Sequence, residues 1–147
     1  MIVFIGCGKS KQAYAKIQAY KMYTGTFFST CLQYALTLTD RKHIYILSAR
    51  YGVLDLDDII TTYNITLNNA TQEYCNNWTK KVKAQFFLKH ITQDTPVTML
   101  CGKNYYKGLL DYFYNINIPL ESYSGMGYQI EFMKKEITKA KTIFKIK

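Results

Sequence analysis

Residues 2–11 read Ile2-Val3-Phe4-Ile5-Gly6-Cys7-Gly8-Lys9-Ser10-Lys11, and they hold the clearest signal of the fold. The apolar first half predicts a buried β-strand. The second half is a small, basic loop that offers backbone N–H groups, ammonium groups and a hydroxyl to an anion. It is not a triphosphate P-loop, because that motif needs a glycine five positions before Gly8 and Val3 stands there.

Two later loops have the same character. Residues 48–52 (Ser-Ala-Arg-Tyr-Gly) follow an apolar run at 43–48, and residues 101–106 (Cys-Gly-Lys-Asn-Tyr-Tyr) follow a strand expected at 96–101. Helical spacing predicts helices at 26–38, 70–90, 104–115 and from about 128, with a short extended segment at 117–120. This alternation predicts an α/β fold, a three-layer α/β/α sandwich with a mainly parallel central sheet. In such a sheet the three loops meet where ligands bind.

Length and charge set the class of protein and partner. The 147 residues suit one domain spanning 1–147, and no apolar run reaches transmembrane length, so no membrane partner is expected. We expect no signal or transit peptide and a cytoplasmic location. A net charge of +9 favours a polyanionic partner, nucleic acid or a nucleotide, although a soluble basic protein without such a partner is the alternative.

The cysteines and histidines do not form a metal motif. The four cysteines show no Cys-x-x-Cys spacing, and only two histidines are present, so we expect no metal and no cofactor. Mg²⁺ bridging a bound phosphate stays open. The cysteines are expected to be reduced. Cys7 is either a small residue in a tight turn or a thiol whose reactivity Lys9 and Lys11 increase.

An acidic cluster follows the second loop. Asp55, Asp57 and Asp58 stand within four positions in a chain that has ten acidic residues. Such a cluster in a basic protein suits a general base or the stabilisation of a developing cation. Asp57 is the first candidate catalytic residue and Asp55 the second, whereas Asp58 is expected to serve in a turn or cap.

The remaining candidates surround the expected phosphate loops. Arg50 offers a planar fork for phosphate, and Gly52 permits a turn that other residues resist. Gln129 either reads a base edge or is solvated, and one of Tyr105 and Tyr106 is expected to face the core. The candidate ligand- and phosphate-binding residues are Cys7, Gly8, Lys9, Ser10, Lys11, Ser48, Arg50, Tyr51, Gly52, Gly102, Tyr105, Gly125, Met126, Gly127 and Gln129.

These motifs resemble those of a family of small, largely uncharacterised bacterial and phage domains with a CGKSK … LSAKYGLL … D … Y signature. The matching segments are residues 7–11, Tyr23-Thr24-Gly25 with Phe28, residues 47–54, Asp57, Tyr63, Trp78, residues 102–105, and residues 125–127 with Gln129. Leu56 stands where the family commonly has proline, which leaves open which aspartate matches. The chain is also distantly similar to the YaaA-type peroxide-stress proteins, which are associated with DNA binding, and to a domain of archaeosine-type tRNA transglycosylases.

The last resemblance implies a fold like that of uracil-DNA glycosylase and, by analogy, hydrolysis of a nucleobase N-glycosidic bond. In that reaction Asp57 would stabilise the sugar cation, and Tyr51 or Tyr105 would stack on the base. His43 and His90 do not fall in the glycosylase loops, so no catalytic histidine is expected. The alternative is a protein that binds DNA or sequesters a nucleotide-like ligand without turnover, as in phage–host conflict.

Overall fold

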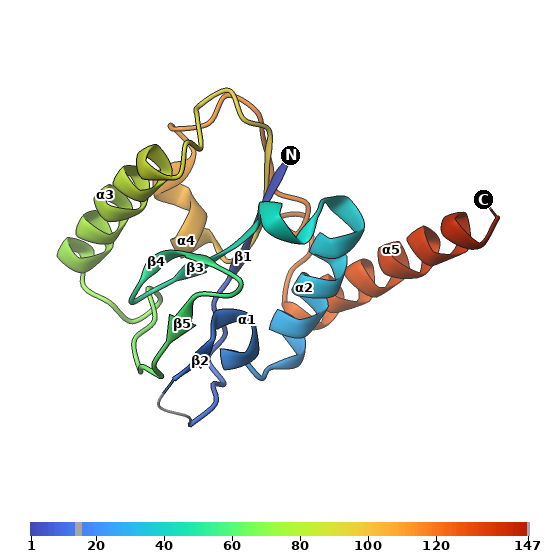
Figure 1. Cartoon of the computed structure of the whole chain (residues 1–147), viewed down its shortest axis with the longest axis horizontal. Helices are drawn as coiled ribbons and strands as arrows, with labels where there is room; N and C mark the ends of the chain where they lie inside the picture. Colours follow the sequence, from blue (N-terminus) through green and yellow to red (C-terminus); the bar gives the residue numbers. More distant parts are fainter. Residues whose placement is uncertain (14–15, 147) are drawn as a thin grey trace.

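A computed structural model describes residues 1–13 and 16–146 of the chain. Its centre is a mainly parallel five-stranded sheet in the order β4-β3-β1-β6-β7, of which Figure 1 labels β4, β3 and β1. The strands are β1 (Ile2–Gly6), β3 (Ile44–Ser48), β4 (Gly52–Asp55), β6 (Val97–Leu100) and β7 (Ile116–Asn117). β1, β3, β6 and β7 run parallel, so their carboxyl ends meet at one side of the sheet, here called the carboxyl edge. The opposite side is the amino edge.

The two faces of the sheet bury different apolar clusters. Side chains of β1 alternate between them, with Val3 and Ile5 on one face and Ile2 and Phe4 on the other. The first face packs against α2 (Thr26–Leu38) and α5 (Met126–Ile146), and the second against α3 (Gln72–Leu88) and α4 (Lys103–Tyr106). Figure 1 shows α5 continuing past α2, away from the sheet.

The longer helices follow the sequence pattern closely. α2 covers the expected residues 26–38 and buries Phe28, Cys31 and Tyr34 at helical spacing. α3 begins after Thr71, whose hydroxyl accepts a hydrogen bond from the backbone N–H of Tyr74. α5 begins at Met126, two residues before the expected start.

The helix expected over 104–115 is much shorter in the structure. α4 ends at Tyr106 and passes into a short 3₁₀ segment, η2 (Lys107–Leu109). Beyond it, the N–H of Tyr114 donates to the carbonyl of Gln93, and the carbonyl of Asn115 accepts from Val97. These long-range bonds draw the chain alongside the segment before β6, so it leaves the helical path and enters β7.

Residues 48–58 form a hairpin rather than the expected acidic loop. β4 runs antiparallel to β3, with Ser48 opposite Gly52 and Tyr45 opposite Asp55. The reversed strand therefore carries Asp55 back to the amino edge. This corrects the expectation that the acidic cluster lies beside the strand-end loops.

A second, two-stranded sheet was not expected from the sequence. It pairs β2 (Ile17–Gln18) with β5 (Ile59–Ile60), next to α1 (Ala19–Met22), and a 3₁₀ turn, η1 (Arg41–His43), leads into β3. Two-residue strands carry no periodic signal, so only pairing between distant segments creates them. Among the described residues, the helices are all too short or too polar to cross a membrane.

Candidate functional site

The loops after β1, β3 and β6 meet at the carboxyl edge, as their shared character predicts. The N–H of Cys7 donates to the carbonyl of Leu47 at 3.0 Å, which joins the first loop to β3. The Cys7 thiol lies 3.4 Å from the hydroxyl of Tyr105, which joins the same loop to α4. Residues 98 positions apart in the sequence therefore share one site.

The loop between Gly8 and Lys11 is held by neighbouring backbone. The carbonyl of Ser10 accepts a hydrogen bond from the backbone N–H of Thr24 at 3.0 Å. The backbones of Lys11 and Tyr23 form an isolated antiparallel β-bridge. Lys9 and Ser10 are exposed, whereas Lys11 is half-buried and its ammonium nitrogen lies 4.6 Å from the centre of the Tyr63 ring. The loop therefore presents one exposed cation and one cation that is held against an aromatic face.

Ser48, at the end of β3, is fully buried and anchors a chain of hydroxyl groups. Its hydroxyl oxygen accepts from the backbone N–H of Arg50 and of Tyr51, and its proton points to the hydroxyl of Tyr63, 2.9 Å away. The Tyr63 hydroxyl lies 2.6 Å from that of Tyr23. The indole N–H of Trp78 donates to the Ser48 carbonyl at 2.7 Å, which ties α3 to this end of β3.

Burial governs the protonation of these groups. It raises the pKa of the Tyr23 and Tyr63 hydroxyls well above the ordinary phenol value, and negative charge on the Cys7 sulfur raises both further. Burial lowers the pKa of Lys11, an effect that charge on Cys7 opposes. The tyrosines are therefore neutral hydrogen-bonding groups over the physiological range.

Tyr105 is placed as a structural residue of the site. Its ring is buried and stands edge-on to Trp78. Its hydroxyl contacts Cys7, the backbone N–H of Leu67 and the hydroxyl of Thr66, all at 3.3–3.4 Å. The ring face is therefore packed against protein, and the stacking role given to either Tyr51 or Tyr105 fits Tyr51 better, since Tyr51 is only half-buried.

Arg50 and Tyr51 occupy the turn that joins β3 to β4. The Arg50 side chain is exposed, and its guanidinium lies 5.4 Å from the centre of the Tyr51 ring. Gly52 adopts a φ of +78°, the conformation for which the sequence predicts glycine at a turn. This turn therefore places an exposed cation and an aromatic ring next to the loop of Gly8–Lys11.

Gly102 and Gln129 line a separate hollow of about 340 Å³ at the carboxyl ends of β6 and β7. The Gln129 amide donates to the carbonyls of Leu120 and Tyr123, both at 3.1 Å. It therefore closes the turn before α5, and its amide protons are not available to a base edge. Gly125, Met126 and Gly127 are exposed at the start of this helix.

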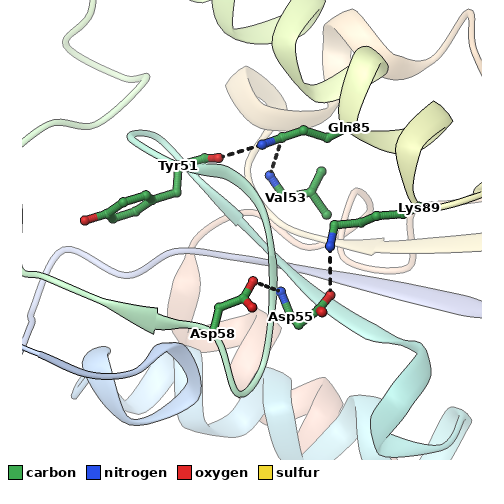
Figure 2. Close-up of polar contacts among 6 residues, drawn as sticks. All are labelled: Tyr51, Val53, Asp55, Asp58, Gln85 and Lys89. Carbon is green, nitrogen blue, oxygen red and sulfur yellow. Dashed lines mark hydrogen bonds and ion pairs between the residues drawn. The ribbon is translucent and has the colours of Figure 1, made fainter.

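Asp55 and Asp57 are not brought together with the strand-end loops. Asp57 pairs with both terminal nitrogens of the Arg41 guanidinium, at 2.5 and 2.9 Å, and Asp55 pairs with Lys89 at 3.1 Å. Asp58 accepts from the backbone N–H of Asp55, as expected for a turn residue. Figure 2 shows Asp55 and Asp58 at one end of the hairpin and the Tyr51 ring at the other. Their catalytic role stays a prediction, but it would act at the amino edge.

Tyr23 and Tyr63, whose hydroxyl groups bond each other in the site, are not among the ligand-binding residues that the sequence predicts. Both lie in segments without helical or strand periodicity, and they approach one another across 40 positions of sequence. The signal that marks them is their place in the family motifs. In the described part of the chain, no group of three or more His, Cys, Asp or Glu side chains is placed to hold a metal ion.

Comparison with known proteins shows the family of this chain. No curated protein matches it. One family profile does match, that of a family of unknown function, DUF6884, and the match spans residues 2–135. It includes the loops after β1, β3 and β6 and the four tyrosines of the site, Tyr23, Tyr51, Tyr63 and Tyr105. Because the match covers nearly the whole chain, this protein belongs to the DUF6884 family.

Proposed function

We propose that the carboxyl edge binds a nucleotide unit, free or within a nucleic acid chain, with its phosphate on the cationic loops. The observation that carries this proposal is the group of cations in the loops after the parallel strands, together with the absence of aspartates from those loops. Lys9, Lys11, Arg50 and Lys103 follow the carboxyl ends of the parallel strands. All six aspartates of the chain, Asp40, Asp55, Asp57, Asp58, Asp94 and Asp111, lie in segments at the amino edge.

This arrangement suits a polyanion that approaches one side of the molecule. Cations gathered at one edge raise the local concentration of a phosphate-bearing ligand there, and the distant aspartates repel it least at that edge. Tyr51 adds an aromatic face beside Arg50, which suits stacking against a base. The arrangement supports binding without requiring turnover, so sequestration of a nucleotide-like ligand is the simplest activity.

We also propose that the fold is a three-layer α/β/α sandwich like that of uracil-DNA glycosylase. Its support is the pair of apolar clusters, one on each face of the sheet, and the meeting of strand-end loops at one edge. We propose as well a distant relationship to the peroxide-stress proteins that are associated with DNA binding. The basic carboxyl edge supports this relationship. A DNA or nucleotide partner follows from the same reasoning.

A matched pair of charge variants tests the binding proposal. We expect Arg50→Ala to weaken binding of a labelled single-stranded oligonucleotide, or of the best binder in a nucleotide panel, by roughly tenfold, because a charge-assisted phosphate contact is lost. Lys42→Ala removes the same charge from the amino edge and is expected to leave binding nearly unchanged. Fluorescence polarisation at two salt concentrations measures both. Equal losses of affinity in the two variants would show that binding depends on the net charge of the protein and not on the carboxyl edge, which would contradict the proposal.

Cleavage of an N-glycosidic bond is the second candidate, and one carboxylate favours it. Glu121 lines the hollow beside Gly102 at the carboxyl edge, on the same side of the sheet as the phosphate loops. It is therefore better placed than Asp57 to stabilise a sugar cation there. Mass spectrometry of released bases, from DNA and from nucleotides, tests this. Base release that Glu121→Gln abolishes and Asp57→Asn does not supports it, and no release from any substrate contradicts it.

A further inference from the structure

Lys81 of α3 is a cation at the β3–β4 turn that no sequence motif marks. Its ammonium group donates to the backbone carbonyl of Arg50 at 2.6 Å, so the side chain ends beside this turn. An ammonium group has three N–H donors, and among the described residues the carbonyl of Arg50 is the one acceptor for them. Because Lys81 is an exposed residue, its other two donors are free for a ligand.

Arg50 and Lys81 are neighbouring cations without a carboxylate between them. Across residues 1–13 and 16–146, the ion pairs use other groups, and neither of these two side chains takes part in one. Partial burial lowers the pKa of the Lys81 ammonium, and the charge of Arg50 lowers it further. An anion that binds both groups relieves their repulsion, so this pair is suited to a phosphate.

Lys83 and Lys89 show the contrast in and just after the same helix. The ammonium nitrogen of Lys83, two positions after Lys81, lies 2.9 Å from Oδ1 of Asp111. That of Lys89 lies 3.1 Å from Oδ1 of Asp55. The protein itself neutralises these two charges, whereas the charge of Lys81 has no carboxylate partner in the described part of the chain.

Two tyrosine rings connect this cation pair with the first strand-end loop. The Arg50 guanidinium lies 5.4 Å from the centre of the Tyr51 ring, and the Tyr51 ring stands edge-on to that of Tyr63, with centres 5.8 Å apart. The ammonium nitrogen of Lys11 lies 4.6 Å from the centre of the Tyr63 ring. The contacts therefore run from a cation through two aromatic rings to a second cation.

Tyr51 is held at its backbone and at its hydroxyl. Its carbonyl accepts from the side-chain amide of Gln85 in α3 at 2.9 Å, and its ring points the other way (Figure 2). The hydroxyl bonds the side chain of Thr61 at 2.9 Å and accepts from the backbone N–H of the same residue at 3.2 Å. A half-buried ring that is fixed in this way loses little conformational freedom when a base stacks on it.

We infer that the ligand of the carboxyl edge is a single-stranded nucleic acid, with one phosphate held between Arg50 and Lys81. A second phosphate lies on the loop of Gly8–Lys11, and the ring of Tyr51 stacks on a base between the two. Cations that alternate with aromatic rings match the phosphates and unpaired bases of a single strand. The inference rests on the proposed nucleotide function and names its substrate class, a chain rather than a free nucleotide.

A matched pair of lysine variants tests this inference in the full chain. We expect Lys81→Ala to weaken a labelled single-stranded oligonucleotide by about tenfold and to reduce the slope of log affinity against log salt by about 0.7, because one phosphate contact is lost. Its affinity for a nucleoside monophosphate should not change, because that ligand lacks the second phosphate. Lys83→Ala removes the same charge from the same helix and should leave oligonucleotide binding nearly unchanged. Fluorescence polarisation over a salt series measures the oligonucleotide, and titration calorimetry the monophosphate.

The salt slope separates a lost phosphate contact from a displaced turn, since Lys81 also holds the Arg50 carbonyl. A displaced turn would move Tyr51 and weaken the monophosphate as well, with the salt slope unchanged. Lys81→Arg keeps the charge and should keep most of the oligonucleotide affinity. Circular dichroism confirms that each variant is folded.

The outcomes distinguish this inference from the proposed function. If the oligonucleotide binds and Lys81→Ala loses no more affinity than Lys83→Ala, or loses it equally for the monophosphate, the inference is overturned and nucleotide binding stands. Binding of the monophosphate without binding of the oligonucleotide has the same meaning. If neither ligand binds, the proposed function fails and the inference fails with it.

Discussion

At Gly52 one missing side chain lets the β3–β4 hairpin lie against α3. The residue has a φ of +78°, and a Cβ atom added to it would lie 2.2 Å from Oε1 of Gln85. That oxygen accepts from the N–H of Val53 at 2.8 Å, and the amide nitrogen of Gln85 donates to the carbonyl of Tyr51 at 2.9 Å (Figure 2). Gln85 thus holds the turn that positions Arg50 and Tyr51 at the carboxyl edge.

We expect Gly52→Ala to lower the free energy of unfolding by about 2–4 kcal/mol, from the strained backbone and the displaced Gln85. Gly127→Ala is the control, since no atom lies within 4 Å of the added methyl group and the site is helical, so stability should stay the same or rise by up to about 1 kcal/mol. Urea denaturation measures both. A loss below about 1 kcal/mol for Gly52→Ala would show that Gln85 moves aside freely.

Among the helices, α5 is anchored by its first half. Met133 is fully buried and Ile137 nearly so, both in the cluster shared with α2, whereas Ile143 is 55% exposed. The family match ends at Lys135, close to the point where the buried contacts end. The later turns of the helix therefore add little to the core.

We expect Met133→Ala to cost about 2–5 kcal/mol, because it opens a cavity in the apolar cluster that α5 shares with α2. Ile143→Ala deletes a side chain of similar size from an exposed position and should change stability by no more than about 0.5 kcal/mol. Chemical denaturation of the two variants gives the comparison. A large cost for Ile143→Ala would mean that the end of α5 is covered in solution, by a second copy of the chain or another partner.

Across the whole molecule, buried phenols and thiols make stability sensitive to alkali. Burial raises the pKa of Tyr23, Tyr63, Tyr105 and Cys101, and it raises that of the Cys31 thiol to about 12. In the unfolded chain these groups titrate near their ordinary values, about 8.5 for thiols and about 10 for phenols. Above those values the unfolded state has lost protons that the folded state keeps, so folding becomes less favourable.

The expected result is a thermal midpoint that is level near pH 7 and falls as the pH rises beyond about 8.5, more steeply beyond about 10. Tyr63→Phe removes one of the contributing groups, so its midpoint should fall less steeply above pH 10. Tyr114→Phe removes an exposed phenol and should leave the slope as it is in the unmodified protein. Calorimetry at several pH values gives the slopes. Identical slopes in all three proteins would assign the alkaline loss to other groups.

Local sequence patterns are enough to predict the main elements and where they converge. Val3 and Ile5 alternate with Phe4 in a run long enough for one strand, and Phe28, Cys31 and Tyr34 recur at helical spacing, so β1 and α2 follow from local periodicity. Because parallel strands joined by helices bring their carboxyl ends together, the meeting of the three basic loops follows as well.

Which side chains meet at that edge depends on packing between distant segments. The direction of β4 depends on the tight turn at Gly52 and on Gln85 of α3, and this direction carries Asp55 and Asp57 away from the loops. The Ser48–Tyr63–Tyr23 chain joins two irregular segments and a strand end, and the pairing of Gln129 with two carbonyls depends on how α5 packs. Such contacts have no period along the chain, because packing between distant segments sets them.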